Sequence, residues 1–225
     1  MLLLAVPQSA RAAREQARQV VENLLDPVGV GPHDGPWWDA HVDLGIVAYP
    51  TDSVYGIGCD IFNRRAVERL HALVRTVKEQ DHAPLSFICR DLSNISEYAH
   101  INNFAYRTMK RVLPGPYTCI LEATKLVPKV MLTKRKTVGI RVPDAAIPLS
   151  IVDVLGNPIA TTSATSQGEL IADPWEIENL YGHQIEAVVD GGYLFPEPST
   201  VIDFTGPEPV LVRMGKGSID EFEEA

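Results

Sequence analysis

The sequence predicts an α/β protein built on a twisted, mixed, open sheet that is flanked by helices. Strand-like apolar runs alternate with amphipathic segments, but without the regular βαβ period of a doubly wound sheet. The chain has 225 residues, of which 45% are hydrophobic and 22% charged, as is typical of a globular protein with a real core. We therefore treat residues 1–225 as a single domain with an acidic, solvated C-terminal tail.

Periodic apolar positions predict the helices. After Asn63, which is a typical N-cap, Val67, Leu70 and Val74 recur at helical spacing and predict a helix that ends near Lys78. The other predicted helices are 9–25, 93–98, 103–112, one or two turns within 127–132, 147–155 and 174–181.

Short apolar runs bounded by Gly, Pro and polar residues predict the strands. The run Ile46-Val47-Ala48 is typical of a buried strand, and Pro50 stops it because proline has no backbone donor for a central ladder. The apolar start of the chain, closed by Pro7, favours a first strand over a signal peptide. The remaining predicted strands are 85–89, 117–121, 137–142, 159–162, 187–189, 200–203 and 210–213, while 26–39 and 163–168 are predicted as loops.

Residues 50–58 are predicted to form a loop with hydroxyls at Thr51, Ser53 and Tyr55. Gly56 and Gly58 let the backbone turn tightly or come close to a ligand. A polar loop at the carboxyl end of a strand is where open α/β sheets bind small ligands. The alternative is an ordinary exit from a strand.

Charge and cysteine usage exclude several classes of protein. A net charge of −9 excludes a wholly basic nucleic-acid wrapper, although it leaves room for a local basic cleft. Cys59, Cys89 and Cys119 form no CxxC pair, so we expect small core residues and a reducing, cytoplasmic location. No apolar stretch approaches membrane-spanning length, and the histidines have no metal-ligand spacing, so neither a membrane nor a protein-held metal is expected.

Hydroxyls and cations recur at the predicted strand ends without an acid–base pair. Arginine binds phosphate in bidentate fashion and lysine acts as a point charge, so this inventory favours anion recognition and suits phosphoryl or nucleotidyl transfer. Solvated turns and helix ends are the alternative. The phosphate-loop, GxGxxG, GxSxG and HExxH motifs are absent. The clusters are Thr51/Ser53/Tyr55, Arg75/Lys78, Thr118, Lys134–Thr137 with Arg141, Thr161–Ser166, and Ser199/Thr200 with Arg213.

Six segments, in this order, resemble the YrdC/YciO-like family, the threonylcarbamoyl-AMP synthase superfamily. They are 49–56, 114–118, 139–143, 162–164, 198–203 and 210–215, within a motif-bearing core of about 43–217. The resemblance implies the family's twisted sheet with a concave, locally positive cavity. It implies synthesis of threonylcarbamoyl-AMP and pyrophosphate from L-threonine, bicarbonate and ATP, toward threonylcarbamoyladenosine in tRNA. ATP is then a substrate whose phosphates carry Mg²⁺. Members are also described as binding double-stranded RNA, so tRNA or double-stranded RNA is a further expected partner.

The resemblance also implies residue roles by motif position. Lys78 and Ser163 would be catalytic. Thr51, Tyr55, Thr118 and Arg141 would bind the amino-acid substrate, with Arg141 facing its carboxylate. The residues expected to bind the nucleotide are Lys78, Ser163, Thr165, Ser199 and Arg213.

Two departures from the family pattern are visible. Gln80 stands where synthases typically carry arginine, and Thr165 stands where they carry asparagine, so a weak or altered synthase is expected. The stretches 89–93, 134–137 and 191–194 look more like the YciO branch. Two alternatives stay open. One is a non-catalytic protein of the same fold that binds double-stranded RNA or nucleotides, and the other is a carbamoyl-group transferase with another acceptor.

Overall fold

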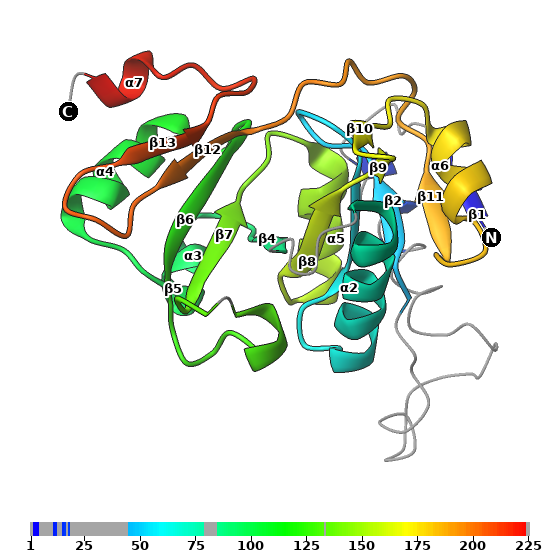
Figure 1. Cartoon of the computed structure of the whole chain (residues 1–225), viewed down its shortest axis with the longest axis horizontal. Helices are drawn as coiled ribbons and strands as arrows, with labels where there is room; N and C mark the ends of the chain where they lie inside the picture. The colour runs from blue at the N-terminus through cyan, green and yellow to red at the C-terminus, as the bar shows by residue number, and fades with distance from the viewer. Residues whose placement is uncertain are drawn as a thin grey trace.

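A mixed sheet of 11 strands forms the centre of the described structure (Figure 1). The computed structural model describes residues 2–4, 11–12, 15–16, 18, 45–78, 85–132 and 134–223. The strands of this sheet are β1 (Leu2–Leu4), β2 (Val47–Tyr49), β3 (Gly56–Asp60), β4 (Ser86–Ile88), β5 (Ala99–His100), β6 (Tyr117–Ala123), β7 (Thr137–Arg141), β8 (Ile159–Ser163), β11 (Ala187–Val189), β12 (Thr200–Asp203) and β13 (Val210–Arg213).

The order of the strands confirms the predicted mixed topology. It runs β1-β11-β2-β3-β8-β4-β7-β6-β12-β13, with β5 paired to β6. The pairs β1/β11, β11/β2, β4/β7 and β6/β12 are parallel. The pairs β2/β3, β3/β8, β4/β8, β6/β7, β12/β13 and β5/β6 are antiparallel.

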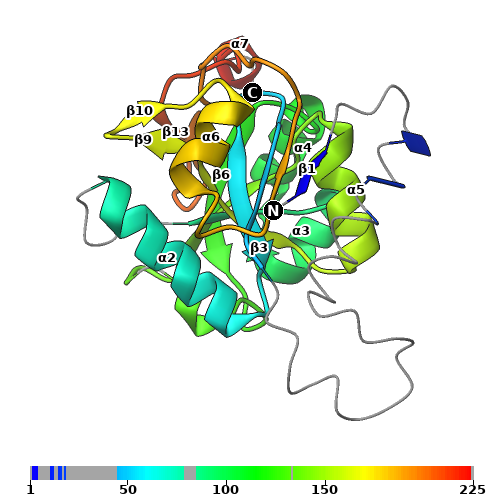
Figure 2. The same ribbon diagram turned by 90° about the vertical axis from the view of Figure 1, so that its right-hand side faces the viewer.

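Helices cover both faces of the sheet. Figure 2 shows α2 and α5 on opposite sides of the strands. In β4, Phe87 belongs to the larger apolar cluster, which includes residues of α2, α3, α4 and α6, while its neighbour Ile88 packs with α5, as the period of two requires. The helical elements are α2 (Arg64–Lys78), α3 (Leu92–Tyr98), α4 (Asn103–Val112), the 3₁₀ turn η2 (Lys129–Met131), α5 (Ala146–Leu155), α6 (Pro174–Tyr181) and α7 (Asp220–Glu223).

Most elements lie where the sequence predicts them. The Asn63 side chain accepts a hydrogen bond from the backbone N–H of Ala66 at 3.0 Å, which confirms it as the cap of α2. All three cysteines are buried and free, as expected. The predicted helix 9–25 falls largely outside the described residues, and the loop 26–39 falls entirely outside them. In the part of the chain that is described, no helix is long and apolar enough to cross a membrane.

The predicted loop at 50–58 was wrong in its second half, where Gly56–Asp60 forms β3 between β2 and β8. The two glycines serve close packing within the sheet rather than a turn. A Cβ on Gly58 would lie 2.5 Å from the carbonyl oxygen of Ala160 on β8, and one on Gly56 would lie 2.8 Å from the ring of Tyr49 on β2. These glycines therefore let three neighbouring strands approach one another.

Two other segments differ from the prediction. The predicted loop at 163–168 contains a small hairpin, in which β9 (Thr165–Ser166) pairs with β10 (Glu169–Leu170). Its turn residues, Gln167 and Gly168, have φ of 50° and 89°, the left-handed values that a two-residue hairpin turn requires. The acidic C-terminal segment, predicted as a tail, contains the short helix α7, in which Asp220 is exposed and the centroid of the Phe222 ring lies 5.7 Å from that of Tyr117.

Candidate functional site

The described residues of the central sheet line a cavity of about 350 Å³. Its walls come from β3, β4, β6, β7, β8, β12 and β13. The volume is typical of a site for a small molecule. Six of the predicted site residues line it, namely Tyr55, Thr118, Arg141, Ser163, Ser199 and Arg213.

Arg141, at the end of β7, supplies a buried cation to this cavity, with only 6% of the residue exposed. Its Nη2 donates to Asp52 Oδ1 at 2.8 Å and to Ser53 Oγ at 3.0 Å. The Nε–H is buried and has no hydrogen-bond partner in the structure. A buried donor left unpaired is costly, so the arrangement favours an acceptor that binds beside Arg141, which lines the cavity.

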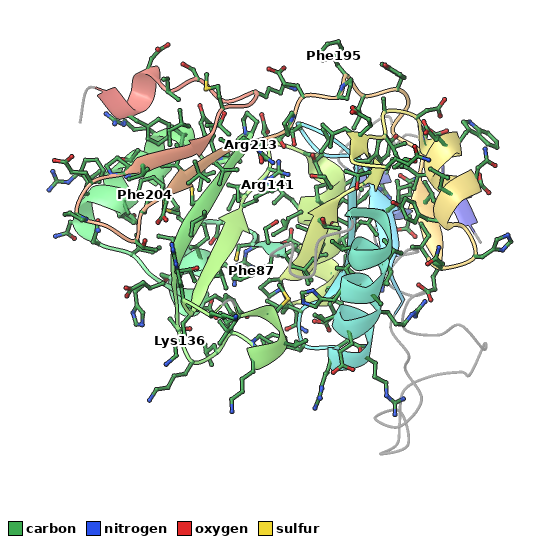
Figure 3. All side chains as sticks on the ribbon, viewed as in Figure 1. Phe87, Lys136, Arg141, Phe195, Phe204 and Arg213 are labelled. Carbon is green, nitrogen blue, oxygen red and sulfur yellow. The ribbon has the colours of Figure 1, made fainter. Side chains whose placement is uncertain are left out.

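Arg213, on β13, is the second cation of the cavity. Figure 3 shows its side chain beside that of Arg141. Its Nη2 donates to the Ser199 carbonyl at 2.8 Å, and Ser199 Oγ in turn lies 2.8 Å from Thr118 Oγ1. These contacts join β13, β12 and β6 at one corner of the cavity.

The electrostatics of the two arginines favour an anionic ligand. Burial lowers the pKa of Arg141, and although Asp52 acts in the opposite direction, the charge of Arg213 lowers it further. Burial also lowers the pKa of Arg213. Both guanidinium groups remain protonated at neutral pH. Arg141 is paired with the Asp52 carboxylate, but the positive charges of Arg141 and Arg213 still repel each other. A ligand with a carboxylate or phosphate would relieve this repulsion.

Tyr55 forms part of the wall and holds the loop after β11. Its hydroxyl donates to the Gly192 carbonyl at 2.8 Å and accepts from the Gly191 N–H at 2.8 Å. Burial raises the pKa of this phenol from its ordinary 10.0 to about 12. Tyr55 is therefore neutral at physiological pH, and its hydroxyl links the cavity wall to this loop.

We expect Tyr55→Phe to lower the free energy of unfolding by about 1 kcal/mol at pH 7, because two part-buried backbone groups, of Gly191 and Gly192, lose their partner. The raised pKa means that the neutral phenol stabilises the fold, and this contribution is present below pH 10.0 and lost as the pH rises through about 12. Urea unfolding of both proteins from pH 7 to pH 12 measures it. The difference between them should shrink across the interval from 10.0 to about 12, and a constant difference would contradict the assignment.

Ser163 lies at the end of β8, opposite Gly56 of β3, and lines the cavity. No described residue accepts from or donates to its hydroxyl, so the group is free to contact a ligand. Thr161, two residues earlier on the same face of β8, also lines the cavity, but its Oγ1 accepts from the Tyr49 hydroxyl at 2.7 Å.

Two predicted site residues whose side chains the structure describes, Thr51 and Thr165, do not line the cavity. Thr51 is buried and its hydroxyl is used within its own loop, donating to the Val54 carbonyl at 2.6 Å and accepting from the Ser53 N–H at 3.1 Å. Thr165 is buried in β9. Lys78 ends α2, and its side chain lies outside what the structure describes, as does Gln80.

Sequence reasoning missed Asp52, the partner of Arg141. Its side chain is 9% exposed, and its Oδ2 accepts from the Asp144 N–H at 3.0 Å. The available signal was that Asp52 is the one acid between residues 46 and 59, placed among hydroxyls. Its pairing with a cation 89 residues away depends on the sheet and could not be seen in the sequence.

The described residues hold no group of His, Cys, Asp and Glu that could bind a metal ion. Cations and hydroxyls dominate the polar side chains of the cavity. Such a site binds and orients an anion and neutralises charge.

Residues 43–215 match a family model named Sua5_yciO_yrdC and described as "Telomere recombination". This chain belongs to the Sua5/YciO/YrdC family. It is 43% identical over 182 residues to a protein of Haemophilus influenzae, covering 79% of this chain and 86% of that protein. It is 41% identical over 181 residues to the YciO protein of Escherichia coli K12, with the same coverage of 79% and 86%.

Solved structures of two members of the Sua5/YciO/YrdC family confirm the fold. The crystal structure of E. coli YciO superposes with a TM-score of 0.80 at 35% identity, covering 98% of both chains. The structure of Pyrococcus abyssi Sua5 complexed with L-threonine superposes with a TM-score of 0.78 at 26% identity. It covers all of this chain and 60% of the Sua5 chain. The P. abyssi threonylcarbamoyl-AMP synthase is 32% identical over 185 residues, covering 80% of this chain and 53% of that protein.

Proposed function

We propose that this protein is a threonylcarbamoyl-AMP synthase-like nucleotidyltransferase, which uses L-threonine, bicarbonate and ATP on the route to threonylcarbamoyladenosine in tRNA. The observation that carries the proposal is the buried Arg141 guanidinium, which leaves its Nε–H unpartnered in a cavity that also holds Arg213. Membership of the family supports it, as does the Sua5 structure that contains L-threonine.

The chemistry needs two anions held side by side. The amine of threonine takes up carbon dioxide from bicarbonate to form a carbamate. A carbamate oxygen then attacks the α-phosphorus of ATP, and the bond to the β-phosphate breaks to release pyrophosphate. The protein must orient both partners and neutralise their charge, for which arginines and hydroxyls suffice. Mg²⁺ would arrive on the phosphates and need few protein ligands.

The residues of the cavity divide into two groups for these partners. Arg141 would bind the threonine carboxylate, near Tyr55 and Thr118. Arg213 and Ser199 would face the nucleotide. The hydroxyl of Ser163, at the end of β8, would contact the carbamate or phosphate. Lys78 would add a cation from the end of α2. A lysine that neutralises the triphosphate is needed for chemistry, so Lys78→Ala is expected to abolish ATP–pyrophosphate exchange.

A single incubation tests the proposal. The protein is mixed with ATP, L-threonine and bicarbonate, and both pyrophosphate and threonylcarbamoyl-AMP are measured. Product formation that requires all three reactants is expected. Replacing L-threonine with L-valine, which has the same shape without the hydroxyl, is the matched substrate control. Pyrophosphate release without threonylcarbamoyl-AMP would contradict the proposal.

The rate should be below that of a synthase with the full family pattern. Gln80 supplies no cation where arginine is typical. A charge-assisted contact that is made mainly in the transition state is worth about 2–4 kcal/mol, or roughly two to three orders of magnitude in rate. Gln80 and Thr165 together also favour the second candidate, a non-catalytic protein that binds nucleotides or RNA, because both replace residues typical of the synthases. Salt-sensitive RNA binding without product would favour that candidate.

A further inference from the structure

All three oxygen atoms of Asp52 accept hydrogen bonds, and one of these bonds comes from Arg141. Its Oδ1 accepts from Arg141 Nη2 at 2.8 Å, and its Oδ2 accepts from the Asp144 N–H at 3.0 Å. Its carbonyl oxygen accepts from Lys216 Nζ at 2.5 Å. Asp52 is not among the residues that line the cavity, so any effect on a ligand must pass through Arg141.

The contacts of Arg141 show what Asp52 controls. Only Nη2 is held, by Asp52 Oδ1 and by Ser53 Oγ at 3.0 Å, whereas the buried Nε–H has no partner. A guanidinium is planar and presents its donors in a rigid fork. Fixing one nitrogen therefore fixes the direction of the others. An arginine that is oriented in advance loses less conformational entropy when a ligand binds.

Lys216 extends this network to the C-terminal segment. Its own N–H donates to the Pro198 carbonyl at 2.8 Å. The residues on either side of it are held by Thr200, whose Oγ1 accepts from the Gly215 N–H at 3.0 Å and donates to the Gly217 carbonyl at 2.6 Å. The backbone of Lys216 is thus held beside β12 by hydrogen bonds. Lys216 follows Arg213 by three residues along the chain. Its ammonium donates to the loop that carries Asp52.

We propose that Asp52 is a positioning residue which, braced by Lys216, holds the Arg141 guanidinium with its free edge toward the cavity for the carboxylate of the amino-acid substrate. This inference rests on the proposed function for the identity of the substrate. Lys216 and Asp52 act without touching the substrate: Lys216 holds the backbone of Asp52, Asp52 orients Arg141, and Arg141 alone of the three binds the anion.

The test separates positioning from a merely structural role. KM for L-threonine and kcat are measured for Asp52→Asn and Lys216→Met, and calorimetry measures L-threonine binding directly. Asp52→Asn should raise KM and the dissociation constant about tenfold, because the charge-assisted bond to Arg141 is lost, with kcat changed by less than about twofold. Lys216→Met should raise both by about threefold, and Lys216→Arg should restore them.

Matched controls come from the same chain. Asp60→Asn removes another carboxylate that accepts hydrogen bonds, from Phe62 and Asn157, but does not line this cavity. Lys125→Met removes an exposed lysine. Neither should change KM. If Asp52→Asn fails to fold, the KM and the dissociation constant for L-threonine are compared between Lys216→Met and Lys125→Met, and this comparison tests the positioning role. An unchanged KM and unchanged threonine binding in Lys216→Met, or a loss of kcat alone in Asp52→Asn, would overturn the proposal.

The calorimetry also separates this inference from the proposed function. If the wild-type protein makes no threonylcarbamoyl-AMP but binds L-threonine, and Asp52→Asn weakens that binding, positioning stands while the synthase assignment fails. If the wild-type protein binds neither L-threonine nor inorganic pyrophosphate, an arginine poised for an anion is refuted as well.

Discussion

Arg141→Met is expected to lower kcat/KM for threonylcarbamoyl-AMP synthesis by about two to three orders of magnitude. Among the described residues, Arg141 is a buried cation of the cavity whose Nε–H has no hydrogen-bond partner, and its removal deletes the group we assign to the threonine carboxylate. Methionine keeps much of the side-chain volume without the charge. Pyrophosphate release and product formation, measured at saturating ATP over a range of L-threonine, check the expectation.

Loss of stability could produce a similar loss of activity, so the design needs a second variant. The Asp52 side chain is 9% exposed, and without Arg141 its carboxylate keeps the Asp144 N–H but loses its cation, which should cost about 3–5 kcal/mol in the free energy of unfolding. The double variant Arg141→Met with Asp52→Asn removes the stranded charge and should recover most of that stability. It should stay inactive. A stable double variant with wild-type kcat/KM would exclude Arg141 from substrate binding.

Gly58→Ala is expected to lower the free energy of unfolding by about 3 kcal/mol, at the upper end of what overpacking costs. The new Cβ would lie 2.5 Å from the Ala160 carbonyl oxygen, 2.7 Å from Ile159 Cγ2 and 2.7 Å from the Tyr49 hydroxyl. The carbonyl belongs to β8 and cannot rotate away, so the pairing between β3 and β8 must shift. Since both strands line the cavity, we expect a parallel loss of threonine binding.

Urea unfolding measures the change, with Gly206→Ala as its control. Gly206 lies in the turn between β12 and β13, and a Cβ there would meet nothing closer than the Glu208 carbonyl oxygen at 3.5 Å. That substitution should change stability by less than about 0.5 kcal/mol. Equal effects of the two alanines would show that the close approach at Gly58 carries no strain.

The sequence was sufficient to predict the mixed α/β fold and most of its elements because their signals are local. Asn63 caps α2 and the apolar spacing that follows belongs to one helix face, so both can be seen within a few turns. Near the cavity, the predicted loops 50–58 and 163–168 contain strands instead, because tertiary packing decides their structure. Gly56 and Gly58 have the composition of a loop, yet they lie in a strand because the neighbouring strands leave no room for a Cβ.

The site was predictable to a similar degree. Hydroxyls and cations at strand ends identified six residues that the sheet brings to one cavity. Thr51 was chosen for the same reason, but its hydroxyl bonds its own loop, a short-range alternative that sequence composition does not distinguish. Asp52 was missed because its role depends on Arg141, and that contact joins the loop after β2 to the end of β7, 89 residues further along the chain.

The order of the central strands determines when each strand can meet its partner during synthesis of the chain. Gly56 pairs with Ser163, and Thr118 is in register with Val201, so two of the strand pairs that line the cavity join segments that leave the ribosome far apart in time. At a translation rate of about 10 residues per second, β3 waits on the order of 10 s for β8. During that interval its edge stays unpaired, which makes the nascent chain a natural client for a chaperone.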